Sequence, residues 1–134
     1  MIKNAKIALI SLGIAILLLS GGCTKKYEDR LEGVWDWVDV VDINSEMTEE
    51  WHFIDYDFAI IRYLNGNPDS TWVWERGSFF LNWSLFGKTL EIDGTSVRSY
   101  NTEWDIIKLT DDFLIISNDI DGGILYKEYI KRSN

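Results

Sequence analysis

Residues Lys88–Ser96 read KTLEIDGTS, and this stretch decides the fold class. Leu90 and Ile92 alternate with polar residues, and DGTS follows as a turn. Strict alternation places apolar side chains on one face of an extended strand and polar side chains on the other. A short strand that ends in such a turn is typical of an antiparallel, all-β meander.

Similar patterns continue on both sides of this stretch. The segment NGNPD, residues 65–69, is a strong hairpin signal, because Asn and Gly tolerate the positive φ that tight turns need. Gly77 lies inside the stretch 71–83 that we predict as a strand, and it predicts a bulge or a sharp bend there. We predict eight strands, at residues 33–41, 49–55, 58–64, 71–83, 88–93, 103–109, 113–117 and 124–131.

Eight short strands with close turns can close on themselves, which removes both exposed sheet edges. We therefore predict an all-β fold, an eight-stranded antiparallel up-and-down β-barrel. The alternative is a two-sheet sandwich built from the same strands. The interior of such a barrel is wide enough to be filled by side chains or to hold one small ligand. The chain has 7 Trp, 6 Phe and 6 Tyr, which suffice to fill most of it.

The N-terminus has the pattern of an export signal. Lys3 and Lys6 precede an apolar run at residues 7–19, and Ser20, Gly21 and Gly22 lead into Cys23, the only cysteine. A basic start, a short apolar run and small residues indicate a cleaved signal peptide, and the run is too short for a standard membrane span. The residues before Cys23 resemble the lipobox of bacterial lipoproteins, which implies cleavage before Cys23 and its acylation, for example by palmitate.

The predicted organisation is a signal peptide at residues 1–22, a lipidated polar tether at 23–30, and a barrel domain at 31–134. An ordinary secretory signal followed by a free thiol is the alternative to lipidation. The formal net charge of −9 excludes a basic groove for nucleic acid and opposes binding to an anionic bilayer. Attachment must therefore come from the lipid, and the expected location is the bacterial cell envelope, on the outer membrane.

Several motifs support a resemblance to a known family. They are LEGVW (residues 31–35), WHF (51–53), RGSFF (76–80), and WDIIKLTDDFLII (104–116) followed by LYKEYIKR (125–132). In order and spacing they resemble the small lipocalin-like domains of many bacterial lipoproteins, over most of residues 31–132. The resemblance implies an antiparallel barrel whose base is closed by the Gly-x-Trp tryptophan, here Trp35. It also implies a small hydrophobic molecule in the barrel mouth.

Six aromatic residues are candidates to line or close the interior. Trp51 and Phe53 share one face of a predicted strand, and Trp72 and Trp74 share a face of another. These side chains bind a ligand if the barrel has a cavity, and they form ordinary core if it is packed. The candidates are Trp35, Trp51, Phe53, Trp72, Trp74 and Trp104.

The segment SNDIDGGILYKE, residues 117–128, matches the calcium-loop template in part. Asp119, Asp121 and Glu128 fall at ligand positions of that template. The flanking residues, however, read as strands where the motif needs helices. A hairpin turn at Asp-Gly-Gly explains the segment without a metal. We expect no metal and no other cofactor.

Catalysis finds little support in the sequence. His52 is the only histidine, and it lies between Trp51 and Phe53, as expected for a surface or rim histidine. The carboxylate pairs Glu49–Glu50 and Asp111–Asp112 fall at predicted turns or strand starts, where we expect solvated charge. We therefore expect a protein that is not an enzyme.

The expected function is that of a lipid-anchored envelope lipoprotein whose barrel binds a small hydrophobic or amphipathic ligand. The alternative is a non-catalytic interaction module with a packed barrel, which binds an envelope protein or a glycan through its outer face or loops. The expected partners are a membrane, reached through the lipid on Cys23, a small ligand and an envelope protein.

Overall fold

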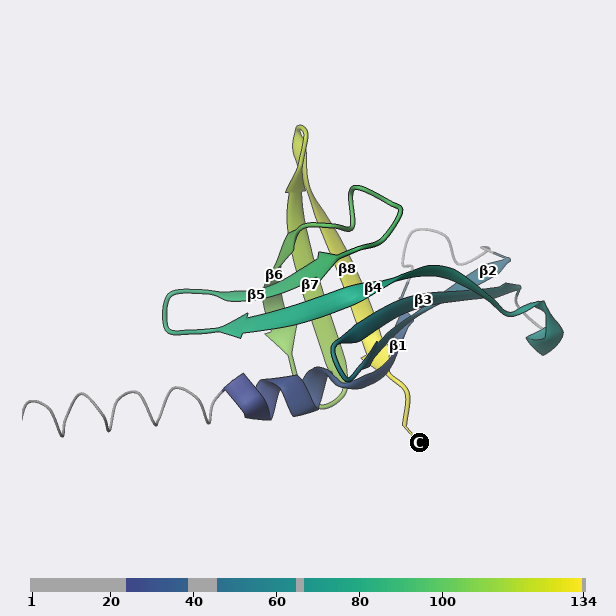
Figure 1. The fold of residues 1–134 in the computed structure, drawn as a ribbon, viewed down its shortest axis with the longest axis horizontal. Coiled ribbons are helices and arrows are strands. Elements are labelled where there is room, and N and C mark those ends of the chain that lie inside the picture. The colour runs from purple at the N-terminus through teal and green to yellow at the C-terminus, as the bar shows by residue number, and fades with distance from the viewer. Residues whose placement is uncertain (1–23, 39–45, 65–66, 134) are drawn as a thin grey trace, which may run out of the picture.

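The computed structural model describes residues 24–38, 46–64 and 67–133 of the 134-residue chain (Figure 1). Eight strands form one closed, antiparallel barrel in chain order. They are β1 (Gly33–Trp37), β2 (Met47–Ile54), β3 (Asp57–Leu64), β4 (Trp72–Trp83), β5 (Lys88–Asp93), β6 (Glu103–Leu109), β7 (Phe113–Ile120) and β8 (Gly123–Lys131), with a short 3₁₀ helix, η1 (Pro68–Ser70), before β4. The predicted signal peptide at residues 1–22 and Cys23 lie outside the described residues.

Pairing between β1 and β8 closes the barrel. Trp35 lies opposite Lys131, and Trp37 lies opposite Tyr129. Past the end of β8, the backbone N–H of Arg132 donates to the carbonyl oxygen of Val34 at 2.9 Å. The predicted up-and-down barrel is therefore confirmed, and the two-sheet sandwich is excluded because the first and last strands are paired.

The alternating strand directions place the connections at two ends of the barrel. We call one end the helix end, where residues 24–31, 55–56, 84–87 and 110–112 lie. We call the other the mouth end, where residues 67–71, 94–102 and 121–122 lie.

The strand positions agree closely with those predicted. In β5, Leu90 and Ile92 are buried while Glu91 and Asp93 are exposed, as the alternation in KTLEID predicted. The predicted first strand extended to residue 41, and residues 39–45 lie outside the described part of the chain. β7 continues three residues beyond its predicted end, because Asn118, Asp119 and Ile120 still pair with β8.

Apolar and aromatic side chains form one cluster inside the barrel. Every strand contributes to it, because each strand turns alternate residues inward. The buried members are Leu31, Trp35, Trp51, Phe53, Phe58, Ile60, Phe79, Leu81, Leu90, Ile92, Trp104, Ile106, Leu109, Leu114, Ile116 and Tyr129.

Gly77 is needed for a close approach of two strands. A Cβ atom there would lie 2.3 Å from the carbonyl oxygen of Asp93, which no side chain tolerates. We predicted a bulge or a sharp bend at this glycine, and the bulge on β4 lies elsewhere. The register shifts where Ile60 pairs with Glu75 and Ile61 pairs with Val73, so that Trp74 is the extra residue.

Residues 23–30 were predicted as a polar tether, whereas residues 24–31 are helical and packed on the barrel. Leu31 is fully buried, and its carbonyl oxygen accepts from the indole Nε1 of Trp35 at 2.7 Å. The carbonyl oxygen of Arg30 accepts from Nζ of Lys131 at 2.8 Å. The chain therefore enters the barrel from a helix fixed by apolar and polar contacts.

Candidate functional site

The centre of the barrel interior is occupied by Trp51. Its ring centroid lies 4.9 Å from that of Tyr129, 5.0 Å from that of Phe58 and 6.2 Å from that of Trp104. Four of the six candidate ligand residues, Trp35, Trp51, Phe53 and Trp104, are fully buried in the same cluster. These four therefore act as core, and the rest of the interior toward the mouth end lies beyond Trp51.

Beyond Trp51, a charged group lies inside the barrel. Glu49 is only 4% exposed, and its Oε1 accepts from the indole Nε1 of Trp51 at 2.7 Å. Its Oε2 accepts from Nη2 of Arg62 at 2.8 Å and from Nε at 3.0 Å. A carboxylate so deeply buried needs such partners, because an unpaired buried charge is very costly.

Lys127 of β8, two strands away from β2 in the closed barrel, extends the charged group. Its side chain is buried, and its Nζ lies 4.0 Å from Oε1 of Glu49. The same ammonium lies 4.5 Å from the ring centroid of Trp37 and 5.5 Å from those of Trp51 and Tyr100. Aromatic rings at this range stabilise a cation that has lost most of its water.

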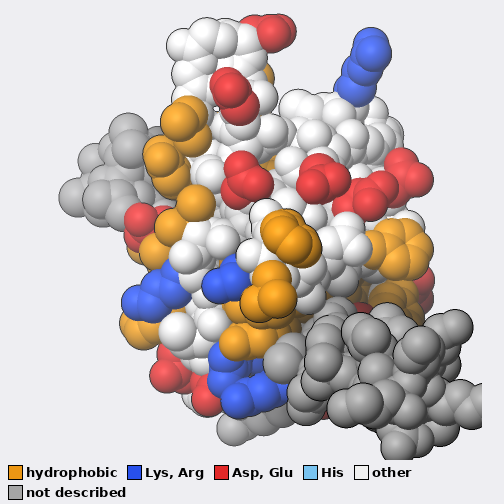
Figure 2. Space-filling view, turned by 90° about the vertical axis from the view of Figure 1, so that its left-hand side faces the viewer, with side chains coloured by type: hydrophobic (Ala, Val, Ile, Leu, Met, Phe, Trp, Pro, Cys, Tyr) orange, Lys and Arg blue, Asp and Glu red, His pale blue; other side chains and the backbone are white. Residues whose placement is uncertain are grey.

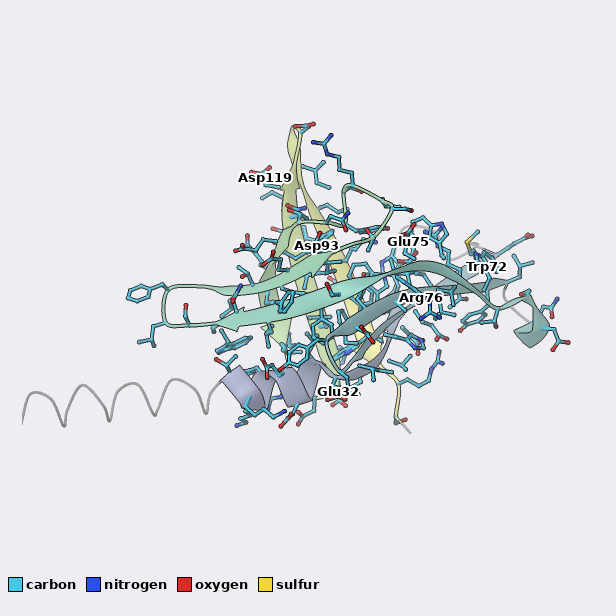
Figure 3. All side chains as sticks on the ribbon, in the orientation of Figure 1. Glu32, Trp72, Glu75, Arg76, Asp93 and Asp119 are labelled. Atoms are coloured by element: carbon cyan, nitrogen blue, oxygen red, sulfur yellow. The ribbon has the colours of Figure 1, made fainter. Side chains whose placement is uncertain are left out.

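The two tryptophans of β4 lie at the rim of this region. Trp74 is half-buried, with the guanidinium carbon of Arg62 3.3 Å from its ring centroid and the ring of Tyr100 at 5.8 Å. Trp72, at the start of β4 in Figure 3, is 39% exposed. The bulge at Trp74 changes the spacing between the side chains of Trp72 and Trp74. The sequence pattern did not predict this change.

The hydroxyl groups of Tyr100 and Tyr129 complete this region. We call the whole region the mouth cluster, and its members are Trp37, Glu49, Arg62, Trp74, Tyr100, Lys127 and Tyr129. Burial, and after it the charge of Glu49, raises the pKa of Tyr100 to about 12. The same two causes, in the same order, raise the pKa of Tyr129 well above its ordinary value. The Tyr129 hydroxyl is the one buried side-chain polar atom that has no hydrogen-bond partner within the described residues.

The segment that carries Tyr100 is fixed to the barrel by hydrogen bonds. The side-chain oxygen of Asn101 accepts from the N–H of Thr95 at 2.9 Å, and its amide donates to the Thr95 carbonyl oxygen at 2.7 Å. Glu75 of β4 accepts from the N–H of Ser96 at 2.8 Å. Tyr100 is therefore held over the interior rather than carried on a loose loop.

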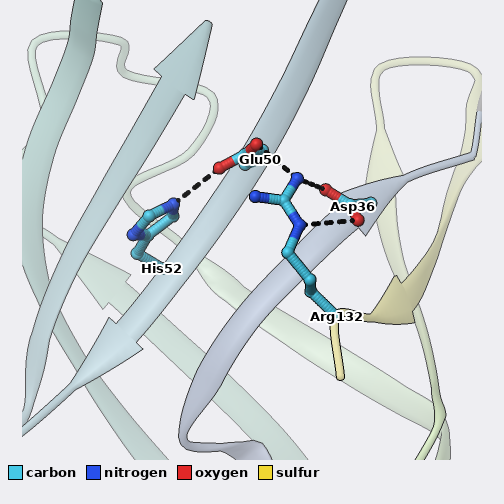
Figure 4. A network of polar contacts seen from close by, with 4 residues as sticks. All are labelled: Asp36, Glu50, His52 and Arg132. Carbon is cyan, nitrogen blue, oxygen red and sulfur yellow. Dashed lines mark hydrogen bonds and ion pairs between the residues drawn. The ribbon is translucent and has the colours of Figure 1, made fainter. Parts of the chain in front are cut away.

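A second polar group lies on the outer face of β1 and β2 (Figure 4). His52 shares a hydrogen bond of 2.9 Å with Glu50, and Arg132 pairs with both Glu50 and Asp36. Burial raises the pKa of Glu50, but the hydrogen bonds from His52 and Arg132 outweigh it and leave the pKa below its usual value. The lone histidine therefore lies half-buried on the outer surface, as expected.

The outer group borders a broad hollow of about 610 Å³. Its lining residues are Glu50, His52, Ile61, Tyr63, Thr71 and Arg132. A neighbouring hollow of about 310 Å³ shares His52 and Ile61 and reaches Arg76. Both lie outside the barrel.

Our expectation of solvated charge at Glu49–Glu50 is wrong. Both residues are buried, on opposite faces of β2, and each is paired with an arginine. The sequence contained a signal for the inward charges. Glu49 precedes Trp51 and Phe53 at a spacing of two, and Arg62 and Lys127 keep the same spacing from buried Ile60 and Tyr129.

The partial calcium motif lies on a simple hairpin. Asp119 pairs with Ile124 and Glu128 pairs with Ile115, so Glu128 lies along β8, well away from the turn at Asp121. Within the described ranges, no group of three or more His, Cys, Asp or Glu side chains could hold a metal ion.

Comparison of the chain with protein-family models, with curated proteins and with solved structures found no match. The structure therefore stands as a closed, eight-stranded antiparallel barrel with an aromatic-rich interior. In the described part of the chain, no helix has the length and apolar character needed to cross a bilayer.

Proposed function

We propose that this protein is an exported bacterial lipoprotein, acylated at Cys23, whose barrel binds a small amphipathic molecule at the mouth cluster without catalysing a reaction. The N-terminal basic residues, the short apolar run and the small residues before Cys23 support export and acylation. Two acyl chains suffice to hold a protein stably on a bilayer.

The chemistry of the mouth cluster supports an amphipathic ligand. Trp37, Trp74 and Tyr100 offer aromatic surface, on which a flat apolar group can stack. Within the mouth cluster, Arg62 and Lys127 carry two positive charges and Glu49 carries one negative charge. The buried carboxylate of Glu75 lies beside the cluster, where it accepts from the N–H of Ser96. A ligand that combines an aromatic body with an anionic or carbonyl oxygen would match both features.

The single observation that carries this proposal is the buried Tyr129 hydroxyl. An unpartnered buried polar group costs about 1–3 kcal/mol. A ligand oxygen that accepts from this hydroxyl would recover that cost, so the free protein is poised to gain from binding. Since burial keeps the pKa of Tyr129 high, the hydroxyl retains its proton at neutral pH.

The test is a titration of the protein with 8-anilinonaphthalene-1-sulfonate, an aromatic anion whose emission rises on transfer from water. We expect saturation at one site per chain. Tyr129→Phe should weaken binding about threefold or more, and Arg62→Gln about tenfold or more. Tyr126→Phe and Arg76→Gln change exposed side chains and serve as matched controls. Emission that fails to saturate, or equal affinity in all four variants, would contradict the proposal.

A second candidate function is supported by the hollow of about 610 Å³ on the outer face. An interaction module would bind an envelope protein or a glycan there, beside Glu50, His52 and Arg132. Ile61 borders both outer hollows, so Ile61→Arg should abolish binding of such a partner and leave the affinity for the aromatic anion unchanged. Unchanged recovery of a stoichiometric partner by that variant would count against the outer face.

A further inference from the structure

The turn between β4 and β5 displays two large apolar side chains to solvent. Leu85 and Phe86 are both 100% exposed. The turn that carries them is ordered, because the N–H of Ser84 donates to the Gly87 carbonyl oxygen at 2.9 Å and the N–H of Phe86 donates to the Ser84 hydroxyl at 3.2 Å. Full exposure of two adjacent large apolar residues is costly in water and marks a contact surface.

This turn lies beside the start of the described chain. The β4–β5 hairpin and the helix of residues 24–31 project to the same side of the barrel (Figure 1). The Thr24 hydroxyl donates to the Trp83 carbonyl oxygen at 3.3 Å, and the ring of Tyr27 stacks on that of Trp83 at 3.5 Å. Cys23, the proposed site of acylation, immediately precedes Thr24 in the sequence.

The residues around the turn suit a lipid–water boundary. Trp83 and Tyr27 are amphipathic aromatics of the type that gathers at membrane interfaces. Lys88 places its Nζ 4.8 Å from the ring centroid of Trp83, and Lys26 is exposed on the helix. Figure 2 faces this side of the molecule and shows hydrophobic side chains near its centre, with Lys and Arg side chains close by. Long basic side chains can lay their stems in the interface and keep their charges in water.

We propose that Leu85 and Phe86 insert into the bilayer that holds the acyl chains of Cys23. This inference rests on the lipid anchor in the proposed function and adds a second point of attachment. One anchor lets a domain rotate, whereas two points on one end fix its orientation. The helix end then faces the lipid, and the mouth cluster, at the opposite end of the barrel, faces away from it.

The test uses the acylated protein with a fluorescent probe on a new thiol. Because acylation consumes Cys23, Phe86→Cys provides the only free thiol. Ser99→Cys, on an exposed residue of the mouth end, is the matched control. Each is labelled with an environment-sensitive nitrobenzoxadiazole probe and placed in phosphatidylethanolamine–phosphatidylglycerol vesicles, some of which carry quenchers on the acyl chains. Both substituted positions are exposed, so folding is expected to persist.

We expect the probe at position 86 to shift to shorter wavelength and to lose emission to the quenchers, while the probe at position 99 does neither. A water-exposed probe at position 86 on acylated protein would overturn the insertion and leave the anchor intact. A shift that appears without vesicles and grows with protein concentration would also overturn it, in favour of a second copy covering the turn. Intact mass without acyl chains would instead overturn the anchor, and the insertion with it.

Discussion

At the scale of single residues, the mouth cluster combines satisfied and unsatisfied groups. Glu49 receives hydrogen bonds from Trp51 and Arg62, so its burial is compensated. The hydroxyl of Tyr129 receives no such compensation within the described part of the chain. A buried polar group without a hydrogen-bond partner lowers stability. Such a group is expected at a binding site, where a ligand supplies the missing partner.

Tyr129→Phe tests this directly. Removal of an unpartnered hydroxyl should leave the free energy of unfolding unchanged or raise it by up to about 1 kcal/mol, because the ring packing is kept. Denaturant unfolding of the free protein provides the measurement, with Tyr126→Phe on the exposed face of β8 as control. A loss of more than about 1 kcal/mol would mean that the hydroxyl already has a partner.

At the scale of elements, two features stabilise the barrel: the close approach of Gly77 on β4 to the backbone of Asp93, and the docking of the helix of residues 24–31. Gly77→Ala should destabilise the fold by about 1–3 kcal/mol, since its methyl group would meet the Asp93 carbonyl oxygen. Gly123→Ala has open space around the new atom and is the matched control. Thermal unfolding followed by circular dichroism measures both, and equal melting temperatures would show that β4 and the Asp93 carbonyl can separate freely.

The helix of residues 24–31 should contribute to stability as a part of the domain. Leu31→Ala removes a fully buried side chain and is expected to cost about 2–5 kcal/mol of unfolding free energy. Leu85→Ala removes a fully exposed one and should change it by no more than about 0.5 kcal/mol. If both variants unfold at the same denaturant concentration, the helix does not stabilise the barrel.

The strands could be predicted from sequence because alternation is a local property. KTLEID alternates cleanly, and the structure places Leu90 and Ile92 inside as predicted. The helix could not be predicted, because residues 24–30 are mostly polar and their helical form depends on contacts with Trp83 and Lys131. The bulge at Trp74 was missed for a similar reason, since it depends on how β3 and β4 pair.

Of the mouth cluster, only Trp74 was predicted as a ligand residue. Glu49 was expected to carry solvated charge, and Arg62 and Lys127 were not singled out, although each of the three falls on the inward side of its strand. Charged side chains are usually exposed to solvent and are rarely found in a protein core. The sequence pattern alone therefore favoured solvated charge at these positions. Only the folded chain brings β2, β3 and β8 together and pairs these charges.

At the scale of the whole molecule, the buried Tyr129 and the half-buried Tyr100 link stability to alkaline pH. The raised pKa of Tyr100, about 12, means that the folded state keeps a proton which the unfolded state loses near pH 10. The contribution of Tyr100 to the free energy of unfolding is therefore fully present below pH 10 and is lost as the pH rises toward 12. Unfolding at a series of alkaline pH values should show this loss, and Tyr100→Phe should reduce it. A loss of the same size in Tyr100→Phe would place its origin elsewhere.

The closed barrel has a packed middle, a helix end close to the proposed anchor, and a mouth end where aromatic and charged side chains meet. We expect ligand binding to be confined to the mouth end of the molecule. The side-chain N–H groups of the tryptophans can report on both ends at once. Trp74 and Trp51 lie at or next to the mouth cluster, whereas the indole of Trp35 donates to Leu31 at the helix end.

The most direct measurement is a nuclear magnetic resonance titration of ¹⁵N-labelled protein with the aromatic sulfonate, in which the indole signals are followed. The signals of Trp51 and Trp74 should shift together and saturate, and the signal of Trp35 should stay in place. Shifts confined to Trp35 and Trp83, or no saturating shift of Trp51 and Trp74, would contradict a ligand site at the mouth end of the barrel.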